Sequence, residues 1–132
     1  MTTFPSSATR DQPTAIALDV PAEPSAARVV RAVASSVASG VSMGYDRIED
    51  LALAIGEAYS FLLATGPSAI RATLGSTPDG IHIAMEAVEA SSESPEPWAT
   101  SLNRVVLESV AENVEQRSGH LSFAVGATAP VD

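Results

Sequence analysis

The sequence predicts an α+β protein built as a two-layer sandwich, with a sheet covered on one face by helices. Apolar residues alternate in four short segments and recur at helical spacing in three longer ones, in the chain order β–α–α–β–β–α–β. Three helices are too few to cover both faces of a sheet, so we expect a mixed sheet of about four to five strands with three helices on one face. The expected strands are residues 15–20, 70–74, 81–88 and 121–125, and the expected helices are residues 25–38, 48–64 and 98–115.

Length, cysteine content and net charge limit the kinds of function that this chain can have. The 132 residues suffice for one domain with a hydrophobic core. Cysteine is absent, which excludes disulfides and thiolate metal sites and suits a reducing cytoplasm, the location we expect. The net charge of −9, with arginine as the only basic residue besides histidine, repels nucleic acid. Any role in transcription is therefore expected to pass through a protein partner, and the lack of a long apolar run predicts no membrane contact.

The expected domain covers residues 14–128, between an N-terminal tail (1–13) and a C-terminal tail (129–132). The first tail is rich in Ser, Thr and Pro and has no hydrophobic period, so we expect it to be flexible. After the first strand, Ser25 is expected to cap a helix whose inward face carries Val29 and Val33.

Turn residues organise the second half of the chain. The segment GSTPDG joins two alternating runs and predicts a β-hairpin. The loop SSESPEP follows, and the next apolar residues recur at helical spacing through Glu115. The residues expected on the inward face of this helix are Leu102, Val105, Val106, Ser109, Val110 and Val114. Ser118 and Gly119 are expected to end that helix before the last strand.

The central helix, residues 48–64, carries apolar residues on every side, and such a helix is expected to be buried all round. Glu57 lies in its middle, on the same side as Leu53 and Phe61. Burying a carboxylate alone is costly, so Glu57 needs a partner, a ligand or water. Two interpretations remain open: a glutamate at the rim that reaches solvent or an arginine, or a site built on this helix.

These segments together resemble a known family. LDVPAEPSAARVVRAV (18–33), IEDLALAIGEAYSFLLA (48–64) and the following hairpin, helix and strand are similar to the anti-sigma factor serine kinases. That family is the RsbW-type branch of the GHKL ATPases, which share the Bergerat fold of histidine-kinase ATPase domains. The resemblance covers about residues 14–128 and implies a Bergerat-like fold.

The resemblance assigns roles on the central helix. The family pattern is close to Leu-Ala-Val-Gly-Glu-Ala-x-x-Asn-Ala, and residues 53–58 match its first part, which places Glu57 at the catalytic base. The family's Asn, which holds Mg²⁺ and phosphates four residues later, is replaced by Phe61. A phenyl ring offers no oxygen ligand for a hard cation.

Two further nucleotide motifs of the family are missing. Its Asp-x-Gly-x-Gly turn is replaced by EASSESPEP (89–97), and its Gly-rich entry into the last helix by PWATSLNRVV (97–106). Phosphate binding needs exposed backbone N–H groups in conformations that glycine supplies. Arg104 is the only basic residue here, among four carboxylates: Glu86, Glu89, Glu93 and Glu96. We therefore expect ATP binding to be weak or lost.

The resemblance implies a bacterial partner-switching regulator. The first hypothesis is an anti-sigma-like protein that sequesters an RNA polymerase sigma factor and is controlled by an anti-anti-sigma protein of the STAS type. Glu57 is then a vestigial base, Phe61 and Arg104 belong to a vestigial cofactor pocket, and neither ATP nor Mg²⁺ is required. The alternative is an active ATP-dependent serine protein kinase that phosphorylates the anti-anti-sigma factor. A third interpretation is an accessory domain that binds another protein or a small ligand in the vestigial pocket.

Assembly and metal binding complete the expectations. The family works as a dimer through its first strand and first helix, so the resemblance implies a homodimer, or a heterodimer with a partner, with Val29, Val33 or nearby residues at its rim. The two histidines, His82 and His120, are isolated in a chain without cysteine, so we expect no metal site.

Overall fold

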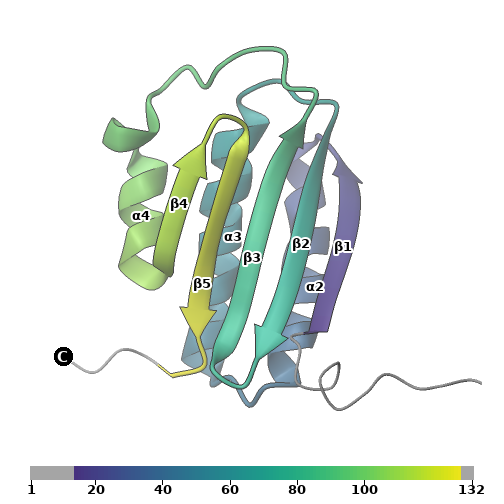
Figure 1. The fold of residues 1–132 in the computed structure, drawn as a ribbon, viewed down its shortest axis with the longest axis vertical. Coiled ribbons are helices and arrows are strands. Elements are labelled where there is room, and N and C mark those ends of the chain that lie inside the picture. The colour runs from purple at the N-terminus through teal and green to yellow at the C-terminus, as the bar shows by residue number, and fades with distance from the viewer. Residues whose placement is uncertain (1–13, 129–132) are drawn as a thin grey trace, which may run out of the picture.

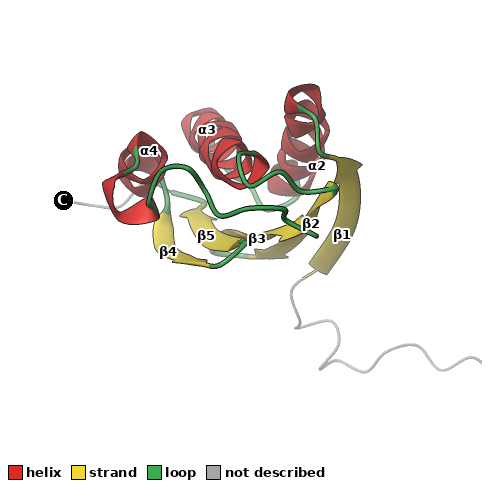
Figure 2. Ribbon diagram, turned by 90° about the horizontal axis from the view of Figure 1, so that it is seen from above, coloured by secondary structure: helices red, strands yellow, loops and turns green. Residues whose placement is uncertain are grey.

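The computed structural model describes residues 14–128, which form one five-stranded sheet with three α-helices on a single face (Figures 1 and 2). The two-layer α+β prediction is confirmed, while both predicted tails lie outside the described residues. The strands are β1 (Thr14–Pro21), β2 (Ala69–Thr77), β3 (Gly80–Val88), β4 (Glu112–Arg117) and β5 (His120–Gly126). The helices are α2 (Ala27–Ser39), α3 (Tyr45–Leu63) and α4 (Leu102–Val110), with the 3₁₀ turns η1 (Pro24–Ala26) and η2 (Trp98–Thr100).

The sheet is antiparallel throughout, so the prediction of a mixed sheet is wrong. The strand order is β1-β2-β3-β5-β4, and each neighbouring pair is antiparallel. Between β1 and β2 the chain crosses the helix layer twice, through α2 and α3, and therefore re-enters the sheet in the opposite direction. Between β3 and β4 it crosses once, through α4, so these strands are parallel, but β5 lies between them.

The predicted hairpin is confirmed as β2 and β3, which pair from Ala69–Val88 to Thr77–Gly80. Asp79 donates its backbone N–H to Thr77 Oγ1 at 3.2 Å in the turn. Gly80 has a φ of +155°, and a Cβ there would lie 2.3 Å from the carbonyl oxygen of Val125. Only glycine therefore lets β3 start this close to β5.

The predicted helix over residues 98–115 is wrong in its second half. Helix α4 ends at Val110, and residues 112–117 form β4 instead. Val114, predicted on the inward face of the helix, packs against the core from β4. Leu102 and Val105, predicted on the same face, are 70% and 64% exposed. Helix α4 instead turns Leu107 inward, which is fully buried.

The central helix α3 lies between α2 and α4 and packs on the sheet (Figure 2). Its inward face carries Leu51, Ile55 and Leu62, all at most 1% exposed. Leu53 is 44% exposed, so the prediction that α3 is buried on every side is wrong. The neighbouring helices cover its flanks and leave its outer face open.

Helix α2 begins later than predicted, and Ser25 does not cap it. Pro24 opens the 3₁₀ turn η1, so Ser25 lies inside that turn and no side chain caps α2. Val29, predicted to face inward, is 46% exposed, whereas Val33 is partly buried against the core. Behind this segment, Tyr59 of α3 donates its hydroxyl to the carbonyl oxygens of Pro21 and Glu23 at 3.1 and 2.7 Å.

A buried arginine joins the N-terminal end of α3 to the far edge of the sheet. Arg47 is 6% exposed and pairs with Asp50 and Glu112, each at 3.0 Å. Its Nε also donates to the carbonyl oxygen of Gly126 at 3.0 Å, and its Nη1 to that of Val110 at 3.4 Å. The guanidinium therefore links α3 to the end of α4, to β4 and to β5.

Candidate functional site

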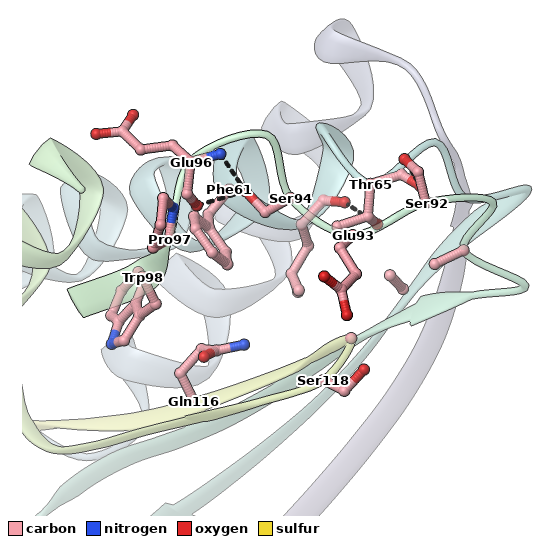
Figure 3. A pocket seen from close by; sticks show the side chains of 14 residues that line it. Phe61, Thr65, Ser92, Glu93, Ser94, Glu96, Pro97, Trp98, Gln116 and Ser118 are labelled. Carbon is pink, nitrogen blue, oxygen red and sulfur yellow. Dashed lines mark hydrogen bonds between the residues drawn. The ribbon is translucent and has the colours of Figure 1, made fainter. Parts of the chain in front are cut away.

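A cavity of about 400 Å³ lies beyond the C-terminal end of α3 (Figure 3). Three segments far apart in the sequence form its walls: the end of α3, the loop of residues 89–97 after β3 with the start of η2, and the turn between β4 and β5. We refer to it below as the α3 cavity. Its volume falls within the range of about 300–1,000 Å³ that is typical of small-molecule sites.

The loop after β3 is tied to the end of α3. Helix α3 ends at Leu63, and Gly66 then turns the chain in the left-handed conformation, with a φ of +66°, before Pro67. The carbonyl oxygen of Thr65 accepts the backbone N–H groups of Ser91 and Ser92 at 3.0 and 3.1 Å. Ser91 Oγ donates to the carbonyl oxygen of Gly66 at 2.9 Å, and a Cβ on that glycine would lie 2.4 Å from this hydroxyl. Gly66 thus allows the loop to close over the helix end.

Two aromatic rings form one wall of the cavity. Phe61 of α3 is 5% exposed, and its ring meets that of Trp98 edge to face, with centroids 4.9 Å apart and an interplanar angle of 74°. Trp98 opens η2 directly after Pro97 and is half-buried. Ser101 then caps α4, because its Oγ accepts the backbone N–H of Arg104 at 3.1 Å.

The charged side chains that line the cavity are two carboxylates, Glu93 and Glu96. In Figure 3 the carboxylate of Glu93 points into the cavity, whereas that of Glu96 points away from it. Within residues 14–128, neither carboxylate forms an ion pair or a side-chain hydrogen bond. The remaining polar lining comes from hydroxyl groups and one amide, on Thr65, Ser92, Ser94, Ser118 and Gln116.

This lining does not fit ATP·Mg²⁺. No arginine or histidine among the described residues lines the cavity, so nothing there balances phosphate charge. The carboxylate of Glu93 would repel a triphosphate, and the ring of Phe61 offers no oxygen to a metal ion. The loop of residues 89–97 also contains no glycine to expose a row of backbone N–H groups.

Glu57 lies outside the lining of this cavity. Its side chain faces α4, where its Oε1 accepts a hydrogen bond from Asn103 Nδ2 at 3.1 Å. The carboxylate is half-buried in the seam between the two helices. Glu57 remains partly exposed, as the rim interpretation expects, but its protein partner is an amide from α4 rather than an arginine.

The other predicted residues are dispersed. Arg104 points away from the cavity, because its Nη1 donates to the carbonyl oxygen of Ala99 at 2.9 Å and its Nε to Glu108 at 3.2 Å. Glu86 pairs with Arg71 on the open face of the sheet. Glu89 accepts a hydrogen bond from Ser68 Oγ at 2.9 Å. Of Glu57, Phe61 and Arg104, only Phe61 lines the cavity, and of the four carboxylates only Glu93 and Glu96 do.

Several lining residues were not predicted. Gln116, Ser118 and Gly119 reach the cavity because β4 and β5 form a hairpin there. The signal for this hairpin was present, since Ser118 and Gly119 form a two-residue turn in which Gly119 has a φ of +67°. The sequence predicts Trp98 at the start of a long helix, whereas the structure places it in the wall of the cavity.

Comparisons with known proteins identify no family. No protein-family model matches the sequence, and no curated protein matches it. Between residues 14 and 128, no helix combines the length and the apolar character that crossing a bilayer requires. In the same range, no three His, Asp or Glu side chains come together as a metal site would need.

Proposed function

We propose that this chain is an anti-sigma-like regulator that binds and sequesters an RNA polymerase sigma factor without using ATP. An anti-anti-sigma protein of the STAS type would control it by competing for the same chain. The proposal follows the resemblance of residues 14–128 to the RsbW-type branch of the Bergerat-fold proteins. It places the chain in the cytoplasm and gives it protein partners rather than nucleic acid.

The observation that carries the proposal is the chemistry of the α3 cavity. The cavity lies among the three segments to which the resemblance assigns the nucleotide: the central helix, the segment after the third strand and the entry to the last helix. Its lining has aromatic rings and carboxylates where a nucleotide site needs basic groups and glycines. Under the resemblance, a two-layer α+β fold whose cavity lacks nucleotide-binding chemistry supports a role in protein binding.

The alternative, an active serine protein kinase, rests on Glu57. A general base must come within hydrogen-bonding reach of the proton that it removes. Glu57 accepts a hydrogen bond from Asn103 in the seam between α3 and α4 and does not line the cavity. This placement favours the binding protein over the kinase.

Inhibition of transcription tests the proposal. Purified chain is added to run-off transcription with RNA polymerase and, one at a time, each sigma factor encoded in the same genome. We expect stoichiometric inhibition of one sigma factor, equal with and without ATP·Mg²⁺. Inhibition that requires ATP, or radiolabelled phosphate transferred to a STAS-type protein, would favour the kinase. Absence of inhibition with every sigma factor would reject the anti-sigma function.

The proposed homodimer has a separate test. Val29 is an exposed apolar residue on the first helix, and Val105 is an equally apolar, exposed residue on α4. Light scattering at micromolar concentration should give a dimer for the wild type and for Val105→Asp, and a monomer for Val29→Asp. The two substitutions add the same charge, so a wild-type monomer, or equal dissociation of both variants, would contradict a dimer through the first helix.

A further inference from the structure

We propose that the α3 cavity binds an organic cation, a guanidinium or ammonium group, between Trp98 and the carboxylate of Glu93. This inference concerns the cavity's own chemistry and does not depend on the anti-sigma function. The cation could belong to a small amine or to a basic side chain of a partner protein. Both sources present the same group to the cavity.

The first argument is charge. Half of the carboxylates within residues 14–128 have a side-chain partner: Asp19, Asp50, Glu86, Glu108 and Glu112 pair with arginines, Glu57 with Asn103, and Glu89 with Ser68. Glu93 and Glu96 have none within residues 14–128, and both line the cavity. Since no basic side chain among the described residues lines it either, the field inside is negative, and a cation supplies the missing partner.

The second argument is the aromatic wall. A cation is attracted to the face of an aromatic ring within about 6 Å of its centroid, and tryptophan is the strongest such partner. Trp98 lines the cavity and is half-buried, so part of its indole remains open to an occupant (Figure 3). The edge-to-face contact with buried Phe61 fixes the orientation of the indole before any ligand arrives.

The third argument is the supply of hydrogen-bond acceptors. Guanidinium and ammonium groups donate hydrogen bonds and accept none. Gln116 donates its Nε2 to the carbonyl oxygen of Arg117 at 2.7 Å, which leaves its Oε1 as an acceptor. The hydroxyl oxygens of Ser92 and Ser118 line the same space and can accept as well. An apolar ligand would offer these acceptors no donor, and an anion would meet the carboxylate of Glu93.

The chain carries its own reporter of binding, because Trp98 is its only tryptophan. The probes are agmatine, which carries one guanidinium and one ammonium group, and tetramethylammonium, with sodium chloride at matched ionic strength as control. We expect a saturable change in tryptophan fluorescence with agmatine and tetramethylammonium and none with sodium chloride. AMP, an anionic nucleotide, should produce no saturable change.

Two matched pairs of variants locate the binding. Glu93→Gln should weaken agmatine about two- to fivefold, as expected for a partly exposed ion pair. Glu49→Gln on the exposed start of α3 removes the same charge and should change nothing. Trp98→Leu should weaken binding about two- to thirtyfold, whereas Trp98→Phe should retain most of it. Both Trp98 variants lack the tryptophan fluorophore, so their binding is followed by NMR through the amide chemical shifts of Ser118 and Gly119.

The source of the cation is tested with a blocked Gly-Arg-Gly peptide. If the peptide binds as well as agmatine, the cavity accepts a side chain of a partner, and if only agmatine binds, it takes a free amine. Three outcomes overturn the proposal: no saturable change up to about 10 mM agmatine, equal weakening by Glu93→Gln and Glu49→Gln, or tighter binding of AMP than of agmatine.

Discussion

The two ends of α3 are built in opposite ways. At its N-terminal end, Arg47 is buried and paired with Asp50, Glu112 and two backbone carbonyls. At its C-terminal end, Glu93 and Glu96 belong to the lining of a cavity, and no basic side chain among residues 14–128 lines it. The charges of the Arg47 network stabilise the fold, whereas the carboxylates at the cavity remain available to a ligand.

Removing the arginine should have the largest effect. Arg47→Met leaves Glu112 and Asp50 without their cation in a partly buried place, so we expect a loss of about 3–5 kcal/mol in the free energy of unfolding. Urea denaturation measures it. The control is Arg71→Met, which breaks pairs whose side chains are about half exposed and should cost less than about 1 kcal/mol. Equal losses would show that burial does not distinguish the Arg47 network.

Phe61 tests the opposite end of the helix. Phe61→Asn removes a buried ring from the cavity wall and should lower stability by about 1.5–3 kcal/mol. Leu53→Asn, on the exposed part of the same helix, is the control and should cost much less. Thermal melts with and without ATP·Mg²⁺ should coincide for both the wild type and Phe61→Asn, because the remaining lining still lacks basic groups. A wild-type melting temperature that rises by several degrees with ATP would contradict this prediction, since a ligand that binds the folded state stabilises it.

Tyr59 is an anchor in the C-terminal half of α3. Its hydroxyl donates to two carbonyl oxygens of the segment between β1 and η1, so Tyr59→Phe should cost about 1–2 kcal/mol at neutral pH. Burial raises the pKa of Tyr59 above its ordinary value. The stability that this shift contributes is therefore complete below the unfolded pKa of about 10 and is lost as the pH rises through the higher folded value.

The measurement is the urea midpoint of both proteins from pH 8 to 11, roughly the range that brackets an ordinary tyrosine pKa. The wild type should lose stability more steeply than Tyr59→Phe above about pH 10. A smaller slope should persist in the variant, because a hydrogen bond to Glu49 raises the pKa of Tyr45 as well. Parallel curves would mean that the Tyr59 hydroxyl titrates alike in the folded and unfolded states.

Glu57 should show the smallest effect. Glutamine keeps the side-chain oxygen that accepts from Asn103, so Glu57→Gln should change stability by less than about 1 kcal/mol and leave partner binding intact. Asn103→Ala removes the donor instead and should cost about 1 kcal/mol. Partner phosphorylation that the wild type performs and Glu57→Gln abolishes would reverse the preference for a binding protein.

The hairpin of β2 and β3 was predictable because local chemistry determines it. Alternation on both sides of GSTPDG and the need for Gly80 agree with each other. The helix boundary after Val110 was not predictable from periodicity, because apolar residues 102–114 fit a helical repeat equally well. The deciding features are the extended backbone of Ala111 and the left-handed Asn113, whose φ is +53°. Strand β4 pairs with β5 through Glu112 and again from Glu115, with an irregular register between them that contains Asn113, and this contact is not local in sequence.

In the candidate site, too, local features could be predicted from the sequence and contacts between distant segments could not. Phe61 could be placed at the cavity from the resemblance alone, since its position within the helix fixes its direction. The partner of Glu57 could not, because Asn103 approaches from a helix 46 residues away along the chain. Arg104 was assigned to the pocket as the only basic residue nearby, but its capped helix turns it toward Glu108 and the carbonyl of Ala99.

The loop after β3 is the part of the cavity wall that can change in length without disturbing the rest of the fold. Its first residues are hydrogen-bonded to the end of α3 through Ser91 and Ser92, and Trp98 holds its far end against Phe61. Residues 93–97 between these anchors are largely exposed and contribute nothing to the buried core. Lengthening such a loop costs little, about 0.6 kcal/mol for each doubling. Descendants of this chain can therefore acquire new ligand preferences by insertion or deletion at this one place, while the sheet and helices stay unchanged.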